Sequence, residues 1–183
     1  MGKLSGKKVV LIIASEGYHP VEYGVPANKL REENAILITA SDKPGGAIAK
    51  DNSTTAAVDV TLDKLNAASY DGIFFIGGPR ALDCLDNSTS YKIIADAKKH
   101  NVPYGAICIA TRILAKGYGL QGKKATGWDG DGALETILTS FGATYDKKPI
   151  ATDGLIVTAS GPEAAEQFAE GIIRVITKKE FEK

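Results

Sequence analysis

Continuous apolar runs alternate with amphipathic stretches along most of the chain. The run at residues 8–14 is rich in β-branched side chains and is typical of a strand covered on both faces of a parallel sheet. Over residues 21–33 the apolar positions recur at helical spacing, and Pro26 is expected to bend this helix. Further strands are expected over residues 35–39, 72–76, 103–107, 124–127, 150–152 and 155–158, and further helices over residues 88–100, 109–116, 133–141 and 163–178. This order predicts a doubly wound α/β sandwich: one domain, residues 1–183, with a mainly parallel central sheet and helices on both faces.

Residues 42–61 break this alternation. A Pro-Gly-Gly turn at residues 44–46 precedes a mixed stretch of small and polar residues, which predicts a minor hairpin or edge pair, antiparallel to its neighbour. Residues 15–20 and 79–82 are expected to form turns, and residues 62–69 a short helix or turn.

Charge and hydropathy narrow the classes of partner. The 183 residues include 22 Lys and Arg and 22 Asp and Glu, so the formal net charge is zero and no one-signed field attracts nucleic acid or an anionic membrane. The apolar runs are far shorter than the roughly 20 residues that span a bilayer, and the first residues lack the apolar stretch of a signal peptide. We expect a cytoplasmic protein with neither nucleic acid nor membrane as partner.

Soft ligands and nucleophiles are scarce. The chain has two cysteines, Cys84 and Cys108, and two histidines, His19 and His100, with no paired metal-binding spacing among them. We therefore expect no metal site and no disulfide framework. Any chemistry should depend on a single thiol, a carboxylate or backbone groups.

One of the cysteines occupies a position that favours reactivity. Residues 105–111 have the form of a nucleophile elbow, in which a strand turns sharply into a helix and Cys108 stands at the corner. The helix dipole and the following amides are expected to lower the pKa of its thiol. If the strands are adjacent, the amide of Ile109 and an amide of the Gly77-Gly78 turn together form an oxyanion site.

Several blocks of the chain, taken in order, resemble the ThiJ/PfpI superfamily. They are the N-terminal strand with residues 17–26, Tyr70-Asp-Gly-Ile-Phe-Phe-Ile-Gly-Gly-Pro79, Gly105-Ala-Ile-Cys108, Gly122-Lys-Lys-Ala-Thr126 and Asp153-Gly-Leu-Ile-Val-Thr-Ala-Ser-Gly-Pro162. This superfamily includes intracellular proteases, a protein deglycase, glyoxalases and isocyanide hydratase. The resemblance implies a flavodoxin-like sandwich without a metal or organic cofactor, and at least a homodimer.

The resemblance also implies roles for individual residues. Cys108 matches the reactive cysteine, Glu22 the glutamate whose carboxyl group meets the sulfur, and Gly78 and Ile109 the backbone donors of the oxyanion site. A carboxyl desolvated beside a thiolate has a raised pKa, so Glu22 is expected to stay protonated and to donate a hydrogen bond or a proton. It would equally stabilise a cysteine sulfinate.

Two departures from the family pattern argue against a conventional peptidase. Protease-type members have a histidine directly after the cysteine, where this chain has Ile109, and deglycase-type members have one where this chain has Gly127-Trp128-Asp129. Isocyanide hydratase-type members have Thr-Gly after the cysteine, whereas this chain has Ile109-Ala110. A Cys-His-Asp triad therefore cannot be built from the local sequence, which disfavours peptidase activity. Trp128 could cover the thiol, and Asp129 could supply the missing charge.

Of the remaining candidates, His19 has two interpretations, and the other two residues have a structural one. His19 follows the first strand on the same side of the sheet as Cys108, so it could face the site as a substitute base, or it could be a solvated or capping residue. His100 at a helix end is interpreted as structural, and Cys84 as a packing cysteine.

The sequence thus predicts a cysteine-dependent protein acting on a small-molecule electrophile. In this hypothesis a Cys108 thiolate paired with protonated Glu22 attacks small carbonyl or related compounds, in a glyoxalase- or deglycase-like reaction or as a hydrolase or hydratase. The alternatives are a non-enzymatic redox sensor or stress-response protein acting through oxidation of Cys108, and an interaction module with a vestigial site. Whether catalysis occurs at all, and on which substrate, stays open at this point.

Overall fold

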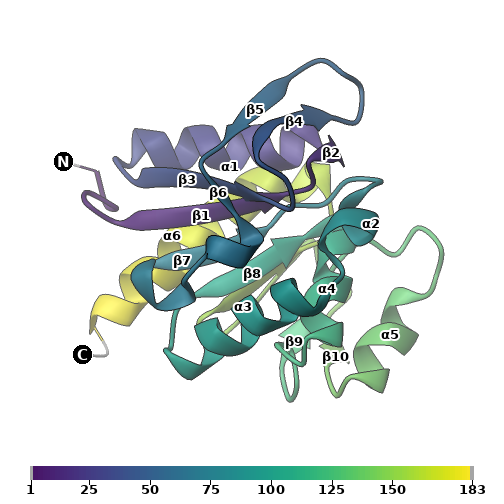
Figure 1. Ribbon diagram of the computed structural model, residues 1–183. Helices are drawn as coiled ribbons and strands as arrows, with labels where there is room; N and C mark the ends of the chain where they lie inside the picture. Colours follow the sequence, from purple (N-terminus) through teal and green to yellow (C-terminus); the bar gives the residue numbers. More distant parts are fainter. Residues whose placement is uncertain (1, 182–183) are drawn as a thin grey trace.

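A mainly parallel sheet forms the centre of the protein. The computed structural model describes residues 2–181 and shows this sheet between helices on both sides (Figure 1). Its order is β11-β12-β8-β7-β1-β3-β6, and every neighbouring pair is parallel except β11 and β12. The strands are β1 (Lys8–Ile13), β3 (Ile36–Ser41), β6 (Val60–Thr61), β7 (Gly72–Phe75), β8 (Tyr104–Ile107), β11 (Ile150–Asp153) and β12 (Ile156–Ala159). The predicted doubly wound α/β fold is confirmed.

The side chains of β1 show why a continuous apolar run belongs at the centre of such a sheet. Alternate residues of a strand point to opposite faces. Val10 and Ile12 pack in one hydrophobic core, whereas Val9, Leu11 and Ile13 pack in the other. Both faces of the strand are therefore buried, and each needs its own layer of helices.

The helices supply these two layers. On one side lie α1 (Pro20–Glu32) and α6 (Ala165–Phe181), which contact each other; α3 (Ser88–Lys99) and α4 (Thr111–Lys116) cover the opposite side (Figure 1). The shorter elements are α2 (Ala81–Leu85), α5 (Leu134–Ser140) and the 3-10 turns η1 (Leu62–Lys64), η2 (Ala67–Ser69), η3 (Cys108–Ala110) and η4 (Pro162–Ala164). None of the helices described is both long and apolar enough to cross a membrane.

A small second sheet stands beside the main one. Its order is β2-β4-β5, from β2 (Glu16–Tyr18), β4 (Gly45–Ala49) and β5 (Thr55–Val58), and the β4–β5 pair is the expected antiparallel hairpin. The expected turn at residues 15–20 is wrong in part, because β2 pairs in parallel with β4. A strand of three residues is too short to show a periodic pattern and exists only because β4 lies beside it. A strand was expected at β9 (Lys124–Ala125) but not at its parallel partner β10 (Thr144–Tyr145), whose two residues are likewise too few to show a pattern.

Candidate active site at the strand ends

Cys108 stands at the junction between β8 and the helical segment η3–α4. Its backbone has φ +64°, a left-handed conformation that is uncommon for a residue with a side chain and is kept where the surroundings enforce it. The residue is 9% exposed. The geometry is that of the expected elbow, with the sulfur at the carboxyl end of the sheet.

The Gly77-Gly78 turn lies next to this elbow because β7 and β8 are hydrogen-bonded neighbours. A Cβ atom added to Gly77 would lie 2.5 Å from Oε2 of Glu22 and 2.7 Å from Cβ of Cys108. Gly78 has φ +132°, and a Cβ there would lie 2.7 Å from the backbone nitrogen of His19. Only glycine fits at these two positions, because the loop before α1 and the elbow pack directly against the backbone of the turn.

Glu22 lies in the first turn of α1 and is 0% exposed. No residue that the structure describes gives either carboxyl oxygen a well-formed hydrogen bond. Burial raises the pKa of Glu22 to about 7, although the neighbouring Cys108 thiol and the Gly77 amide partly oppose this shift. The expected raised pKa is therefore present, and at neutral pH the carboxyl is divided between its protonated and ionised forms.

The thiol of Cys108 behaves differently from the sequence-based expectation. Burial raises its pKa, and the charge and acceptor oxygens of Glu22 raise it further, whereas the Ile109 amide lowers it. The expected lowering of the Cys108 pKa is wrong for the resting site, because desolvation and the adjacent carboxylate outweigh the amides of a short helical segment. The resting cysteine is a thiol.

A cavity of about 680 Å³ opens over this pair. Of the expected site residues, Cys108, Glu22, Gly78 and Ile109 line it. His19, Trp128 and Asp129, which the sequence offered as site neighbours, line it as well. Gly77 lies beneath the cavity, in contact with the pair.

His19 precedes α1 in the capping position, yet its side chain makes no capping hydrogen bond. Its backbone N–H donates to the carbonyl of Gly77 at 3.0 Å. The ring nitrogen Nδ1 is buried and has no partner among the described residues. Burial lowers the pKa of the imidazole, with a smaller contribution from Lys50, so His19 is neutral at neutral pH. Of its two interpretations, the structure favours a residue of the cavity wall over a cap.

Trp128 and Asp129 are each held by a hydrogen bond with a backbone group of another segment. The Trp128 N–H donates to the carbonyl of Cys108 at 3.2 Å, which ties this loop directly to the elbow. The indole is 38% exposed. Oδ1 of Asp129 accepts from the N–H of Leu134 at 2.9 Å, so one carboxylate oxygen helps to begin α5.

Three further ionisable residues of the cavity lining were missed from the sequence: Lys50, Tyr145 and Glu163. They follow β4, end β10 and lie in η4, respectively. No local motif marks them, because their proximity arises only from the folding together of segments far apart in the chain. Among residues 2–181, no cluster of three or more His, Cys, Asp or Glu side chains could hold a metal ion.

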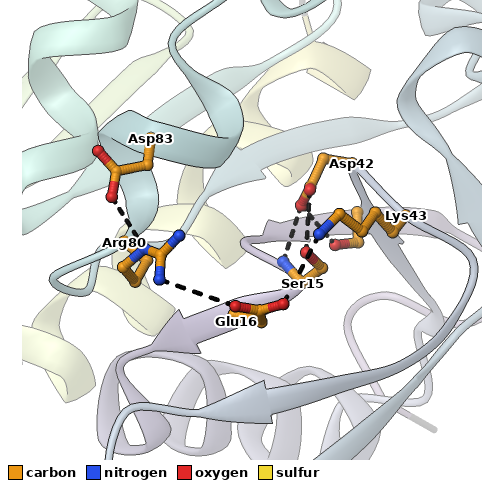
Figure 2. Close-up of polar contacts among 7 residues, drawn as sticks. Ser15, Glu16, Asp42, Lys43, Arg80 and Asp83 are labelled. Atoms are coloured by element: carbon orange, nitrogen blue, oxygen red, sulfur yellow. Dashed lines mark hydrogen bonds and ion pairs between the residues drawn. The ribbon is translucent and has the colours of Figure 1, made fainter.

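A polar network fixes the loop that carries β2 (Figure 2). Ser15 donates to Asp42 through its N–H at 2.7 Å and through its hydroxyl at 2.9 Å. Glu16 forms ion pairs with Lys43 at 3.6 Å and with Arg80 at 3.7 Å, which joins β2 to the residue just after the Gly77–Pro79 turn. The network therefore holds together the backbone segments that place His19 and Gly78.

The other cysteine and histidine have the structural surroundings expected of them. Cys84 is half-buried against the hydrophobic core, and burial raises its pKa. His100 ends α3, where Nδ1 lies 2.8 Å from the carbonyl oxygen of Asp96.

Comparison with known proteins identifies the family to which the chain belongs. Residues 7–175 match the DJ-1/PfpI family. The chain belongs to the DJ-1/PfpI family. This match confirms the ThiJ/PfpI resemblance, and solved ThiJ/PfpI proteins share the fold. A ThiJ/PfpI domain protein of Brachyspira murdochii has a TM-score of 0.88 at 18% identity, covering 95% of this chain and 98% of that one. Drosophila melanogaster DJ-1beta has a TM-score of 0.83 at 22% identity, covering 98% and 93%.

The chain is also similar in sequence to curated proteins over most of their length. General stress protein 18 of Bacillus subtilis is 27% identical over 179 residues, which cover 94% of this chain and 99% of that protein. A Pyrococcus horikoshii protein named as a deglycase is 26% identical over 155 residues, covering 85% and 90%.

Proposed function

We propose that this DJ-1/PfpI protein uses Cys108 as a nucleophile toward small carbonyl or related electrophiles, with Glu22 as the group that accepts the thiol proton. The observation that carries the proposal is the convergence of an elbow cysteine and a fully buried carboxyl at Gly77, beneath an open cavity. The deglycase names of several relatives support chemistry of this class.

Proton transfer within the pair explains how a resting thiol becomes reactive. Since the pKa of Glu22 is about 7, a large fraction of its carboxyl is ionised at neutral pH and able to accept the proton of Cys108. The sulfur then forms a bond to the carbonyl carbon, and the electron pair of the C=O π bond moves to the oxygen. The thiolate with protonated Glu22 is therefore the reactive state and not the resting one.

Backbone amides next to the sulfur are assigned to the developing oxyanion. Ile109 follows Cys108 directly, and Gly78 comes from the adjacent strand end. Both line the cavity, and fixed amides in a partly dehydrated site stabilise developing negative charge strongly. Collapse of the adduct requires a proton donor, and protonated Glu22 takes this role.

His19 completes the proposed site as a second group that moves protons. Its imidazole is neutral and lines the same cavity, and its backbone N–H donates a hydrogen bond to the carbonyl of Gly77. The two places where other members carry a histidine have none here: they hold Ile109 and the segment Gly127-Trp128-Asp129. The local sequence offers no Cys-His-Asp triad, which favours addition, isomerisation or hydration of a small carbonyl over peptide hydrolysis.

A sensor function is the second candidate. The buried Glu22 carboxyl faces the sulfur and in its protonated form could donate to a sulfinate, and one relative is named a general stress protein. In this function the oxidant is a peroxide: two peroxide molecules react in succession, and each transfers one oxygen atom to the sulfur and is itself reduced to water or an alcohol.

Turnover distinguishes the two functions. Purified protein is assayed with methylglyoxal and with amide and peptide substrates, next to Cys108→Ser and the matched control Cys84→Ser. Saturable conversion of methylglyoxal that disappears in Cys108→Ser and persists in Cys84→Ser supports the enzyme. Absence of any turnover, together with a gain of two oxygens on Cys108 under mild peroxide, contradicts it and supports the sensor.

The proposal also includes a cytoplasmic homodimer or larger homo-oligomer, which DJ-1/PfpI membership favours. Light scattering on the purified protein measures its mass, and a mass of one chain at micromolar concentration contradicts this part.

A further inference from the structure

Arg112 is a buried cation next to the elbow that the proposed chemistry does not use. It lies in α4, four residues after Cys108, and therefore one helical turn further along. Its side chain is 8% exposed. The guanidinium donates through Nη1 to Oδ2 of Asp131 at 2.9 Å and through Nη2 to Oδ1 at 2.6 Å, a two-point pairing that fixes both groups in one orientation.

The same guanidinium also holds Trp128. Its Nη2 lies 3.4 Å from the Trp128 carbonyl oxygen, and its central carbon lies 5.4 Å from the centre of the indole ring. The Trp128 N–H is already bonded to the carbonyl of Cys108. The backbone of Trp128 is thus held on one side by the elbow and on the other by Arg112.

The loop around Trp128 needs such an anchor. It contains Gly127, Gly130 and Gly132, so its backbone has unusual freedom, and the indole is partly exposed at the cavity. Asp131 in turn accepts from the N–H of Ala133 at 3.1 Å, which joins the anchored loop to the start of α5.

Stability alone gives no reason for a buried arginine here. Removing a guanidinium from water is costly, and Nε of Arg112 has no hydrogen-bond partner among the described residues. A well-packed apolar side chain of similar volume would stabilise α4 at least as well. What only arginine supplies is the simultaneous contact with a carboxylate, a carbonyl and an aromatic face.

We propose that Arg112, paired with Asp131, is a positioning residue that holds Trp128 as a wall of the cavity and thereby limits the size of the electrophile that reaches Cys108. The size limit rests on the proposed function, because it applies only if electrophiles reach and react with Cys108. The position of the indole does not depend on catalysis.

Alkylation of Cys108 measures the size limit without requiring turnover. In a Cys84→Ala background, the rates of reaction with iodoacetamide and with its bulkier N-phenyl derivative are compared. We expect the rate with the bulky reagent, divided by the rate with the small one, to rise about tenfold in Arg112→Met, which corresponds to ~1.4 kcal/mol of relaxed discrimination. In Arg112→Lys, which keeps the charge but loses the two-point geometry, this rate ratio is expected to rise by less. The matched control is Lys116→Met, which removes another paired cation of α4, outside the cavity lining, and should leave the ratio unchanged.

A double-mutant cycle tests whether Arg112 acts through Trp128. Trp128→Ala alone should raise the ratio, and adding Arg112→Met to it should have no further effect. Independent, additive effects would overturn the proposal. If Arg112→Met does not fold, Asp131→Asn takes its place, since the Asp131 side chain is 42% exposed and can be changed without opening the core. An unchanged ratio in that variant also overturns the proposal.

Fluorescence gives a readout that does not involve Cys108. Trp128 is the only tryptophan of the chain, so its emission reports on this loop alone. Acrylamide should quench it more efficiently in Arg112→Met and Asp131→Asn than in Lys116→Met. If Cys108 reacts with neither reagent in the parent protein, the proposed function fails, whereas unchanged quenching means that the positioning role fails.

Discussion

Glu22 and Cys108 converge on one backbone position, because a Cβ atom at Gly77 would lie within 2.5 Å of the Glu22 carboxyl and 2.7 Å of the Cys108 Cβ. The carboxyl and the sulfur can face each other only because residue 77 has no side chain. Their contact couples the titrations of the two groups, since ionising either disfavours ionising the other.

Gly77→Ala should destabilise the protein and separate the pair. The added methyl group has no space between Glu22 and Cys108, and forcing an extra carbon into a packed interior typically costs about 1–3 kcal/mol. The matched control is Gly24→Ala on α1, where an added Cβ meets no atom within 4 Å and should stabilise the helix by about 0.5–1 kcal/mol. Urea unfolding gives both values, and equal stability of the two variants would contradict the packing described.

Glu22 should make the free energy of unfolding depend on pH. Its pKa is raised from 4.5 to about 7 in the folded protein, so the folded state holds this proton more tightly than the unfolded state. The stabilisation is complete below pH 4.5 and is lost as the pH rises through 7. Relative to Glu22→Gln, which does not titrate, the wild type should lose about 3 kcal/mol between pH 4.5 and 8. Parallel stability curves of the two proteins would show that the carboxyl is not buried in solution.

Glu22→Gln should also make the Cys108 thiol more acidic. The glutamate charge raises the pKa of Cys108, so the neutral amide lowers it and the rate of alkylation by iodoacetamide near pH 7 should rise severalfold. Turnover should nevertheless fall, because the amide cannot accept the thiol proton. Glu163→Gln removes a carboxylate from the same cavity that affects the pKa of Glu22 only as a minor contribution, and serves as control: it should change the alkylation rate much less than Glu22→Gln. A pH–rate profile that is the same in wild type and Glu22→Gln argues against the pairing.

His19→Gln should lower turnover by roughly 10²- to 10⁴-fold, the usual contribution of a positioned proton-transfer group. Alkylation of Cys108 should change little, since the imidazole is neutral and does not hold the sulfur. His100→Gln, at the end of α3, should leave both rates unchanged. If His19→Gln retains full turnover, His19 is only a wall of the cavity.

Much of this architecture can be predicted from short-range pattern. The apolar run of β1 serves two cores because its side chains alternate, and each boundary between apolar and amphipathic stretches lies close to a strand or helix end. The elbow at Cys108 is likewise local, since the strand, the corner residue and the helix are consecutive. Two residues of the elbow, one of the glycine turn and Glu22 were expected at the site, and all four line one cavity.

The errors share a cause. β2 and β10 are strands only because β4 and β9 lie beside them, and two- or three-residue segments have no pattern of their own. The pKa of Cys108 was expected to be lowered by the helix that follows it, yet its direction depends on burial and on a carboxylate that comes from α1. A local dipole can be inferred from local sequence, whereas desolvation cannot.

The sequence by itself therefore determined the α/β sheet and the elbow at Cys108, because each follows from the order of side chains along a short segment, whereas Glu22 was expected only from the family resemblance. Only the tertiary structure decided that the resting Cys108 is a thiol, that His19 lines its cavity, and that Arg112 holds Trp128 beside it. These three properties depend on dielectric environment and on contacts between distant segments, and both arise only when the strand ends are brought together at one edge of the sheet.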